Sequence, residues 1–505
     1  MGLNNRNNGI LLHITSLPSK YGIGDLGLSA YSFIDFLKRS DVGFWQILPL
    51  GPTGYGNSPY ASRSTFAGNE YLLNIDSLIE DGYLDKNVVN NFKNIKKGYI
   101  DFNIVETIKK PLLFKAADNF LLKNIEEKEY NKFLEENKFY IEDYALFMAL
   151  VDYYYDARWY SVWDKDIAIR DESALNSART KLNKEINRYK VLQYLFFKQW
   201  FLLKKYANKN NIKIIGDLPI FVAGDSVDAW ANIELFKTDK NGHYNKVSGC
   251  PPDGFTQDGQ LWGNPVYNWP IHEKTNYKWW ILRIKQQFKL YDFVRIDHFR
   301  GFESYWEIDS NQETAKYGKW VKGPGQKFFN TIKKELGDLP IIAEDLGYLT
   351  KEVENLRNNN NFPGMKIGIF GYNWDNNGNF DFLNMDLPTN YGENFIAYPG
   401  THDNQTILGW FKSLKEYQKQ YLLKILSTTE DNIVWPFIKE LYASRAKVVI
   451  IQMQDLLEKD DSARMNIPST CGPFNWSWQM KENENLDTLE SILKLYNNYY
   501  KRVSK

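Results

Sequence analysis

Eight short, nearly continuous apolar runs recur along the chain, and each ends in polar residues or in glycine and proline. Parallel strands buried on both faces have this pattern, because neither face meets water. Amphipathic helical patterns separate several of the runs, as at residues 30–40, 189–210 and 327–336. Strands that alternate with helices predict an α/β fold, a (β/α)8 TIM barrel. The eight runs occupy residues 9–14, 44–50, 212–220, 293–297, 340–347, 365–370, 394–403 and 446–455.

Two intervals between the predicted strands are longer than a crossover helix requires. Residues 76–211 have mostly helical patterns and are rich in Lys, Glu and Tyr, whereas residues 224–289 are rich in loops. We expect both to be insertions that decorate a single catalytic barrel spanning residues 1–505. The length of 505 residues fits this interpretation, since elaborated α/β barrels reach that size.

Charge and cysteine content narrow the class of protein. The chain carries 62 basic and 62 acidic side chains, so electrostatics gives no reason to expect nucleic acid or a membrane as a partner. Its two cysteines, Cys250 and Cys471, have no metal-ligand spacing, and two reduced thiols fit a cytoplasmic protein. The sequence has no apolar run typical of a signal peptide or a membrane span, so we expect a cytoplasmic location.

Three carboxylates follow separate predicted strands, where barrel enzymes place their active sites. They are Asp297, Glu344 and Asp403. Any one of them alone would fit a helix cap or an ion pair equally well, but the three together favour a catalytic site. Paired carboxylates in a cleft are what glycoside chemistry requires: one ionised beside the sugar carbon, and one protonated beside the leaving oxygen.

The neighbours of two of these carboxylates predict different protonation states. Arg295 lies two residues before Asp297, so both project to one side of the strand, and the guanidinium should lower the pKa of the aspartate. Glu344 follows an apolar run and has Asp345 beside it; a poorly solvated, negative environment should raise its pKa. Asp297 therefore suits a nucleophile, and Glu344 suits a general acid.

Histidines and aromatic residues supply candidates for sugar contacts. His13, His298 and His402 all lie at predicted strand ends, and neutral imidazoles hydrogen-bond sugar hydroxyls. For His13, a structural histidine that bridges strand ends is an equally good interpretation. A metal site is a further alternative, but no H-x-x-x-H or similar pair occurs. Aromatic residues make up 16% of the chain, and tyrosine and tryptophan rings also suit stacking on sugar faces.

Eight sequence blocks, in order and almost end to end, closely resemble the 4-α-glucanotransferases of the amylomaltase type, also called disproportionating enzymes, of glycoside hydrolase family 77. A single "GTHDN" segment would be a modest signal, because related α-amylase-like barrels carry a similar one. The eight blocks together are specific. They are "GILLHITSLPSKYGIGDLG", "LPLGPTGYGNSPYAS", "IIGDLPIFVAGDSVDAWANIELF", "GQLWGNPVYNW", "VRIDHFRGFESYWEI", "IIAEDLG", "YPGTHDNQT" and "ARMNIP".

The resemblance implies transfer of α-1,4-glucan segments between maltodextrins derived from starch or glycogen. It implies a covalent glycosyl-enzyme, retention of configuration, and no metal or other cofactor. Separately, we expect the chain to be a monomer. Asp297 would be the nucleophile, Glu344 the general acid/base, and Asp403 the residue that stabilises the transition state. The substrate-binding residues that it implies are Tyr55, Tyr60, Asp217, Asp253, Phe255, Trp262, Asn264, Arg295, His298 and His402.

Two departures from the family pattern concern the acceptor side. Cys250 stands where an aliphatic residue is usual, and Gly254 where an aromatic residue is common. The alternative function is an α-amylase-type retaining hydrolase, in which water is the acceptor. A glucan-binding protein on an inactive barrel is a third interpretation, and the three carboxylates argue against it.

Overall fold

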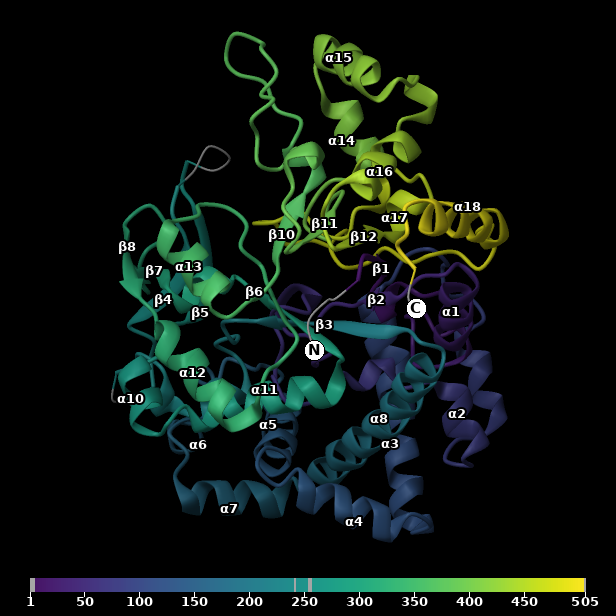
Figure 1. Cartoon of the computed structure of the whole chain (residues 1–505). Coiled ribbons are helices and arrows are strands. Elements are labelled where there is room, and N and C mark those ends of the chain that lie inside the picture. The colour runs from purple at the N-terminus through teal and green to yellow at the C-terminus, as the bar shows by residue number, and fades with distance from the viewer. Residues whose placement is uncertain (1–4, 240–241, 253–256, 504–505) are drawn as a thin grey trace.

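The computed structural model describes residues 5–239, 242–252 and 257–503, and its centre is one eight-stranded parallel sheet that curves into a nearly closed barrel (Figure 1). The strand order is β10-β11-β12-β1-β2-β3-β6-β9. All eight predicted runs form these strands, and the predicted fold class is confirmed. The strands are β1 (Asn7–Leu11), β2 (Phe44–Gln46), β3 (Lys213–Pro219), β6 (Phe293–Asp297), β9 (Ile341–Ala343), β10 (Gly364–Ile367), β11 (Phe395–Tyr398) and β12 (Val448–Gln452).

The barrel is nearly closed between β9 and β10. No ladder joins these two strands in the described residues, but the backbone N–H of Ala343 donates to the carbonyl of Pro363 at 2.9 Å. On the other side of β9, the register with β6 pairs Ile296 with Ala343. The register between β3 and β6 pairs Asp217 with Arg295. These pairings bring the polar residues at the ends of β3, β6 and β9 to one mouth of the barrel.

Helices pack around the barrel and form its outer layer. The long helix α8 (Asn183–Lys209) confirms the helical pattern that precedes the third strand, and it buries apolar residues along most of its length. The other helices outside residues 76–211 are α1 (Leu28–Arg39), α9 (Val227–Ala231), α10 (Trp269–Lys274), α11 (Lys278–Leu290), α12 (Gly325–Leu336), α13 (Lys351–Asn359), α14 (Ile407–Ser413), α15 (Glu416–Leu426), α16 (Val434–Ala443), α17 (Met453–Leu456) and α18 (Leu486–Tyr499).

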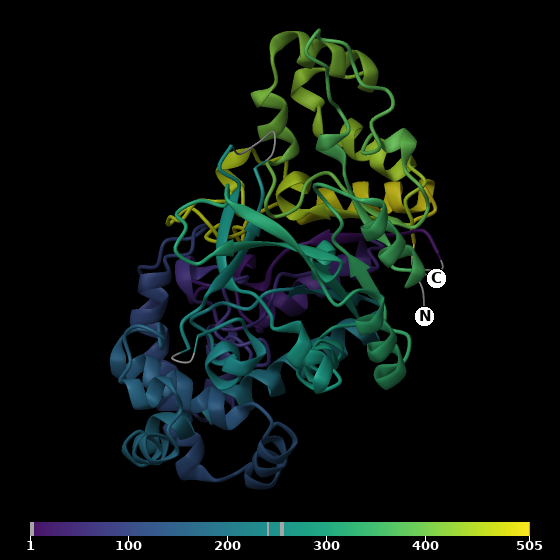
Figure 2. The same cartoon turned by 90° about the vertical axis from the view of Figure 1, so that its left-hand side faces the viewer.

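The interval of residues 76–211 is built almost entirely of helices. They lie at one end of the molecule, and α14 and α15 lie at the opposite end, as both side views show (Figures 1 and 2). Besides α8, the helices of this region are α2 (Ile75–Glu80), α3 (Phe102–Lys123), α4 (Glu127–Glu136), α5 (Ile141–Tyr154), α6 (Lys165–Ala168) and α7 (Glu172–Lys181). None of the helices in the described parts of the chain is long and apolar enough to cross a membrane.

A second, antiparallel sheet stands beside the mouth of the barrel, and the sequence patterns did not indicate it. Its order is β5-β4-β7-β8. Two of its strands fall in the interval that we expected to be rich in loops. The strands are β4 (Lys246–Cys250), β5 (Gln260–Pro265), β7 (Ser304–Asp309) and β8 (Gly318–Lys322).

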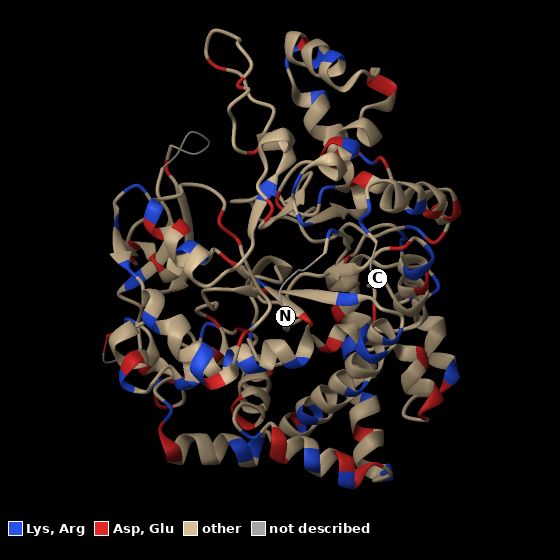
Figure 3. Ribbon diagram, in the orientation of Figure 1, with Lys and Arg blue, Asp and Glu red and all other residues tan. Residues whose placement is uncertain are grey.

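Charged residues of both signs are interspersed along the outer helices (Figure 3). This distribution agrees with the balanced composition of 62 basic and 62 acidic residues. Inside, one glycine allows an unusually close approach: a Cβ on Gly216 would lie 2.0 Å from the ring of Tyr291. The glycine lets that ring pack directly against β3, beside Asp217.

Candidate active site

The three candidate carboxylates line a single open cleft of about 1100 Å³ at the mouth of the barrel. Asp297 is the last residue of β6, Glu344 directly follows β9, and Asp403 follows β11. Parallel strands place their carboxyl ends at one edge of a sheet, which explains how residues more than a hundred positions apart meet.

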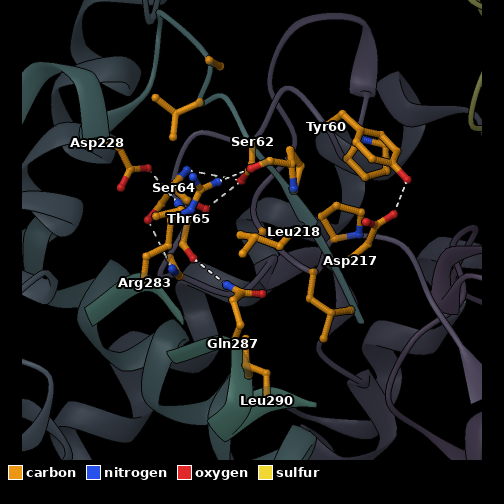
Figure 4. A pocket seen from close by; sticks show the side chains of 18 of the residues that line it. Tyr60, Ser62, Ser64, Thr65, Asp217, Leu218, Asp228, Arg283, Gln287 and Leu290 are labelled. Carbon is orange, nitrogen blue, oxygen red and sulfur yellow. Dashed lines mark hydrogen bonds between the residues drawn. The ribbon is translucent and has the colours of Figure 1, made fainter. Parts of the chain in front are cut away.

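Asp297 is held by a buried arginine. Nη2 of Arg295 lies 2.8 Å from Oδ1 of Asp297 and 2.8 Å from Oδ2 of Asp217. The hydroxyl of Tyr60 donates to the same Oδ2 of Asp217 at 2.5 Å (Figure 4). The side chain of Asp217 is fully buried, whereas 31% of the Asp297 side chain is exposed to the cleft. Asp217 therefore fixes the guanidinium, and the guanidinium orients the exposed carboxylate.

A second buried arginine holds the segments that carry Tyr60 and Asp217. Arg283 on α11 donates to the hydroxyl of Thr65 at 2.7 Å and to the carbonyl of Ile220, just beyond β3, at 2.9 Å. Figure 4 shows Arg283, Thr65 and Asp228 around one side of a small cavity of about 40 Å³, with Tyr60 and Asp217 on the other. The backbone N–H of Thr65 donates to Asp228 at 2.7 Å. These bonds tie the loop after β2 to the end of β3.

Glu344 is bound by two backbone N–H groups. Its Oε2 accepts from His298 at 2.7 Å, and its Oε1 accepts from Leu346 at 3.0 Å. His298 adopts a left-handed backbone conformation with φ of 52°, which non-glycine residues rarely adopt and which clusters at functional sites. This turn directs its N–H away from the barrel ladder and towards Glu344.

The protonation of the two carboxylates differs in part from the expectation. Burial raises the pKa of Asp297, and Arg295 offsets only part of that effect, so the net direction is upward rather than downward. Burial also raises the pKa of Glu344, and the negative charge of Asp297 raises it further. Of the two, Glu344 has the higher pKa, so it keeps a proton at a pH where Asp297 has lost its own.

The predicted negative neighbour of Glu344 was the wrong residue. Asp345 points away from Glu344, because adjacent residues of an extended segment face opposite sides. Its carboxylate is paired with Arg357 and accepts from the backbone N–H of Met365 at 2.8 Å. The negative charge that acts on Glu344 is that of Asp297.

Asp403 remains ionised at lower pH than the other two carboxylates. Burial alone would raise its pKa, but His402 and Asn466 outweigh burial and lower it to about 2. Nδ2 of Asn466 donates to Oδ1 of Asp403 at 2.7 Å, and Nε2 of His402 lies 3.2 Å from Oδ2. Arg464 donates to the backbone carbonyl of Asp403 at 2.6 Å. The side chain is thus a fixed negative charge in the cleft.

The candidate sugar contacts fall into three groups. Asp217 and His402 are buried behind the cleft, and His402 stacks on the ring of Tyr60 at 5.0 Å. Asp253 and Phe255 lie outside the described residues. The others line the cleft: Tyr55, Tyr60, Trp262, Asn264, Arg295 and His298.

Two of these lining residues have informative surroundings. The imidazole of His298 meets the ring of Trp262 edge-on at 4.8 Å, and its Nε2 has no hydrogen-bond partner in the described protein. Burial lowers the pKa of His298 to about 3, so its ring is neutral. A neutral imidazole with an unpaired nitrogen can donate to or accept from a sugar hydroxyl.

His13 does not line the cleft. It is buried, and its Nδ1 accepts the backbone N–H of Leu48 at 3.2 Å, which joins the end of β1 to the segment after β2. His13 and His402 border a separate cavity of about 10 Å³. The structural interpretation of His13, as a bridge between strand ends, agrees with this placement.

Sequence reasoning missed several residues of the cleft wall. Asn466 belongs to the quoted block "ARMNIP", but we assigned it no role. Arg300, Trp320, Tyr348 and Trp476 also line the cleft. Trp320 and Tyr348 stand in short segments whose patterns carry no signal for a sugar site.

Both cysteines line the cleft, and neither takes part in a disulfide. Cys471 lies at the exposed rim, where it interacts with the hydroxyl of Tyr55. Cys250 lies on the wall near Arg300.

Comparisons with known proteins agree on one family. The sequence model of the family described as 4-alpha-glucanotransferase, glycoside hydrolase family 77, matches residues 12–485. The 4-alpha-glucanotransferase of Clostridium butyricum is 46% identical over 490 residues, which cover 96% of this chain and 98% of the relative. The 4-alpha-glucanotransferase of Streptococcus pneumoniae serotype 4 is 44% identical over 503 residues, which cover 99% of this chain and 98% of the relative.

A solved structure gives the same result. The amylomaltase from Streptococcus agalactiae in complex with acarbose superposes with a TM-score of 0.94, is 43% identical, and covers 99% of this chain and 100% of that one. The match of sequence and of fold therefore extends over nearly all of both chains. On this agreement of sequence, fold and cleft, the chain belongs to the 4-alpha-glucanotransferase family, glycoside hydrolase family 77.

Proposed function

We propose that Asp297 is the nucleophile with which this 4-alpha-glucanotransferase transfers segments of α-1,4-glucan between maltodextrins. The observation that carries the proposal is the contrast between two carboxylates of one cleft. Asp297 is oriented by Arg295 at 2.8 Å, whereas Glu344 has a raised pKa and retains its proton. A retaining glycosidase mechanism needs one carboxyl group in each state.

In the first step, Asp297 attacks C1 of the donor sugar, and Glu344 gives its proton to the departing oxygen. The bond from C1 to that oxygen breaks, the reducing-end fragment leaves, and a covalent glycosyl-enzyme forms. The charge of Asp297 is consumed in this bond, which removes one cause of the raised pKa of Glu344. The pKa of Glu344 is therefore lower in the intermediate, which stabilises the ionised carboxylate that must accept a proton in the next step.

In the second step, Glu344 accepts the proton of the 4-hydroxyl of an incoming glucan. That oxygen attacks C1 and releases Asp297, so two inversions give net retention. Asp403 supplies fixed negative charge beside the positively charged transition state, which its pKa of about 2 supports. Electrostatic stabilisation of this kind is commonly a large part of catalysis.

The remaining candidates have roles in substrate binding. Five side chains contact glucan in the cleft: Tyr55, Tyr60, Trp262, Asn264 and His298. Two others act from behind the cleft: Asp217 fixes Arg295, and His402 fixes Asp403. For Asp253 and Phe255, we propose the acceptor cover that the family resemblance implies. Phe255→Ala should then slow transfer more than hydrolysis, because only transfer needs a positioned acceptor.

The partners are maltooligosaccharides and amylose, and we propose that the chain works as a cytoplasmic monomer. We further propose that residues 1–505 are one catalytic unit, with 76–211 and 224–289 as insertions. No nucleic acid, membrane or cofactor has a part in the proposed reaction.

Incubation with maltotriose tests the function. We expect glucose and a ladder of longer maltodextrins, while the number of reducing ends stays constant. Products no longer than maltotriose, with reducing ends rising steadily, would support the α-amylase-type hydrolase instead.

A further inference from the structure

Two aromatic side chains, Trp320 and Tyr348, are exposed on the wall of the cleft. The exposed fractions are 38% for Trp320 on β8 and 71% for Tyr348 on the segment that follows β9. Both line the same cleft as Asp297 and Glu344. Tryptophan and tyrosine rings in a glucan cleft offer flat apolar faces with a polar edge, which suits stacking on sugar rings.

A buried arginine connects these two rings. The guanidinium carbon of Arg300 lies 3.9 Å from the ring centroid of Trp320 and 5.8 Å from that of Tyr348. One Nη of Arg300 donates to the backbone carbonyl of Tyr348, and the other donates to the hydroxyl of Ser304 at 3.3 Å. Arg300 is only 4% exposed, so it fixes both aromatic residues from behind while their outer surfaces face solvent.

The position of Tyr348 indicates which part of the glucan the rings would meet. Glu344, Leu346, Gly347 and Tyr348 all line the cleft, so this wall begins at the acid/base and continues outward. Glu344 must contact the oxygen between the donor ring and the first acceptor ring. Sugar rings that follow on the acceptor side leave Glu344 along the cleft, and Tyr348 lies four residues beyond it.

Another neighbour of Arg300, Cys250, also indicates the acceptor side of the cleft. Cys250 lies close enough to Arg300 to interact electrostatically, and Cys250, Pro251 and Pro252 line the cleft. This segment leads into residues 253–255, for which we propose the acceptor cover. Trp320 and Cys250 therefore both lie near Arg300 on the wall of the cleft.

We propose that Trp320 and Tyr348, braced by Arg300, form a stacking subsite for the acceptor glucan beyond its first ring. The subsite favours maltotriose and longer acceptors over glucose, because glucose reaches only the first acceptor position. This proposal rests on the role of Glu344 as acid/base and assigns a function to residues outside the catalytic carboxylates. An aromatic cluster that only packs around Arg300 would show no such dependence on acceptor length.

The test measures transfer from unlabelled maltoheptaose to acceptors that carry ¹⁴C in the reducing-end glucose. The acceptors are glucose, maltose, maltotriose and maltotetraose, and the initial rate of labelled elongation gives the apparent KM of each. The variants are Trp320→Ala and Tyr348→Ala. Tyr317→Ala is the matched control, because Tyr317 is 68% exposed and precedes β8 by one residue but does not line the cleft.

We expect each cleft variant to raise the apparent KM for maltotriose and maltotetraose by about threefold to tenfold, the range of one aromatic contact. The KM for glucose should change by less than about twofold, and Tyr317→Ala should keep the wild-type ratio between acceptors. Trp320→Phe should restore most of the preference, since it retains a flat ring. Melting curves of all variants identify any that do not fold. If Trp320→Ala does not fold, Tyr348→Ala carries the test.

Equal losses for glucose and maltotriose would overturn the subsite, because they indicate a general distortion of the cleft. Unchanged values for every acceptor in both folded variants would overturn it as well. A wild-type protein that elongates no labelled acceptor would instead overturn the proposed function, and the subsite with it.

Discussion

Nη2 of Arg295 lies 2.8 Å from carboxylate oxygens of both Asp217 and Asp297, so one cation connects a buried acid to an exposed one. The side chain of the buried partner is fully inaccessible, so Asp217 acts through its contacts with Arg295 and Tyr60. The exposed partner faces the cleft. A surface salt bridge would need only one acid, whereas a fixed nucleophile gains from a cation that is itself held in place.

Replacement of Asp297 by asparagine should remove nearly all transfer while the fold persists. The amide keeps the shape and its contact with Arg295 but cannot form the glycosyl-enzyme. We expect the rate of maltotriose disproportionation to fall by roughly a factor of 10⁴ or more. A melting curve serves as the control, because a residue that acted only as an ion-pair partner would change stability rather than the rate of transfer. Near-normal activity in the folded variant would refute the nucleophile assignment.

Activity should depend on pH through both carboxyl groups of the cleft. Transfer rises with pH as Asp297 loses its proton, and because burial raises its pKa, this acid limb lies above the usual range of aspartate. Transfer falls again as Glu344 loses its proton, at a pH well above the usual range of glutamate. The profile of kcat/KM between pH 4 and about 10 measures both limbs. If kcat/KM does not fall with rising pH before tyrosine side chains ionise, the role of Glu344 is contradicted.

The raised pKa of Glu344 also makes the free energy of unfolding depend on pH. Glu344 binds its proton more tightly in the folded than in the unfolded chain, since its pKa is raised by burial and by Asp297. Its contribution to stability is therefore complete below the unfolded pKa and is lost as pH rises through the folded pKa. Glu344→Gln should have a higher Tm than the wild type at pH 8 and about the same Tm at pH 4. A lower Tm at pH 8 would show that the charged carboxylate is stabilising.

The barrel strands could be predicted because burial on both faces makes them continuously apolar, as in "VVIIQ" of β12. The antiparallel sheet could not. Its strand β8, "GKWVK", is mostly exposed and alternates too briefly to differ from a loop. Trp320 was missed for this reason. Its role also depends on Arg300, which lies twenty positions earlier in the sequence and contacts Trp320 only in the folded protein.

The candidate carboxylates could be predicted as a group, but their protonation could not. Sequence shows that Arg295 is near Asp297, and this predicts a lowered pKa. It does not show how deeply the pair is buried, and burial decides the direction. Likewise, the sequence cannot show that Asp345 is neutralised by Arg357, which approaches it from helix α13.

Arg283 should be needed for both stability and transfer. In Arg283→Met, the hydroxyl of Thr65 and the carbonyl of Ile220 lose a buried donor, and we expect a loss of about 3 kcal/mol or more in unfolding free energy. At temperatures where the variant is still folded, kcat should fall, because the loop that carries Tyr60 is no longer tied to β3. Lys285→Met is the control, since Lys285 is exposed on the same helix. Equal effects of the two substitutions in urea unfolding and in kcat would refute this role.

The double variant Cys250→Ser and Cys471→Ser should keep transfer. Both thiols line the cleft, but neither forms a disulfide, and neither lies in a pattern of nucleophile and base. Maltotriose disproportionation by the double variant, and by the wild type with and without reductant, measures this. A folded but inactive double variant, or a wild type that reductant inactivates, would show that a thiol has a part in the reaction.

His13 should fix the orientation of His402, and through it that of Asp403. Because the N–H of Leu48 donates to Nδ1 of His13, the proton of the neutral imidazole is on Nε2. Burial lowers the pKa of His13 to about 3, so the ring stays neutral. His13 and His402 border one cavity of about 10 Å³, which has room for about one water molecule. Nε2–H of His13 can therefore donate towards His402 through a single water.

Nε2 of His402 lies 3.2 Å from Oδ2 of Asp403, so the position of this ring sets the position of the carboxylate. We expect His13→Leu to lower kcat roughly tenfold, within the range typical of groups that orient a catalytic residue, and His13→Gln, which can still donate, to retain most of it. Melting curves identify any variant that does not fold. A wild-type kcat in folded His13→Leu, or an equal loss in His13→Leu and His13→Gln, would show that His13 is only a bridge between strands.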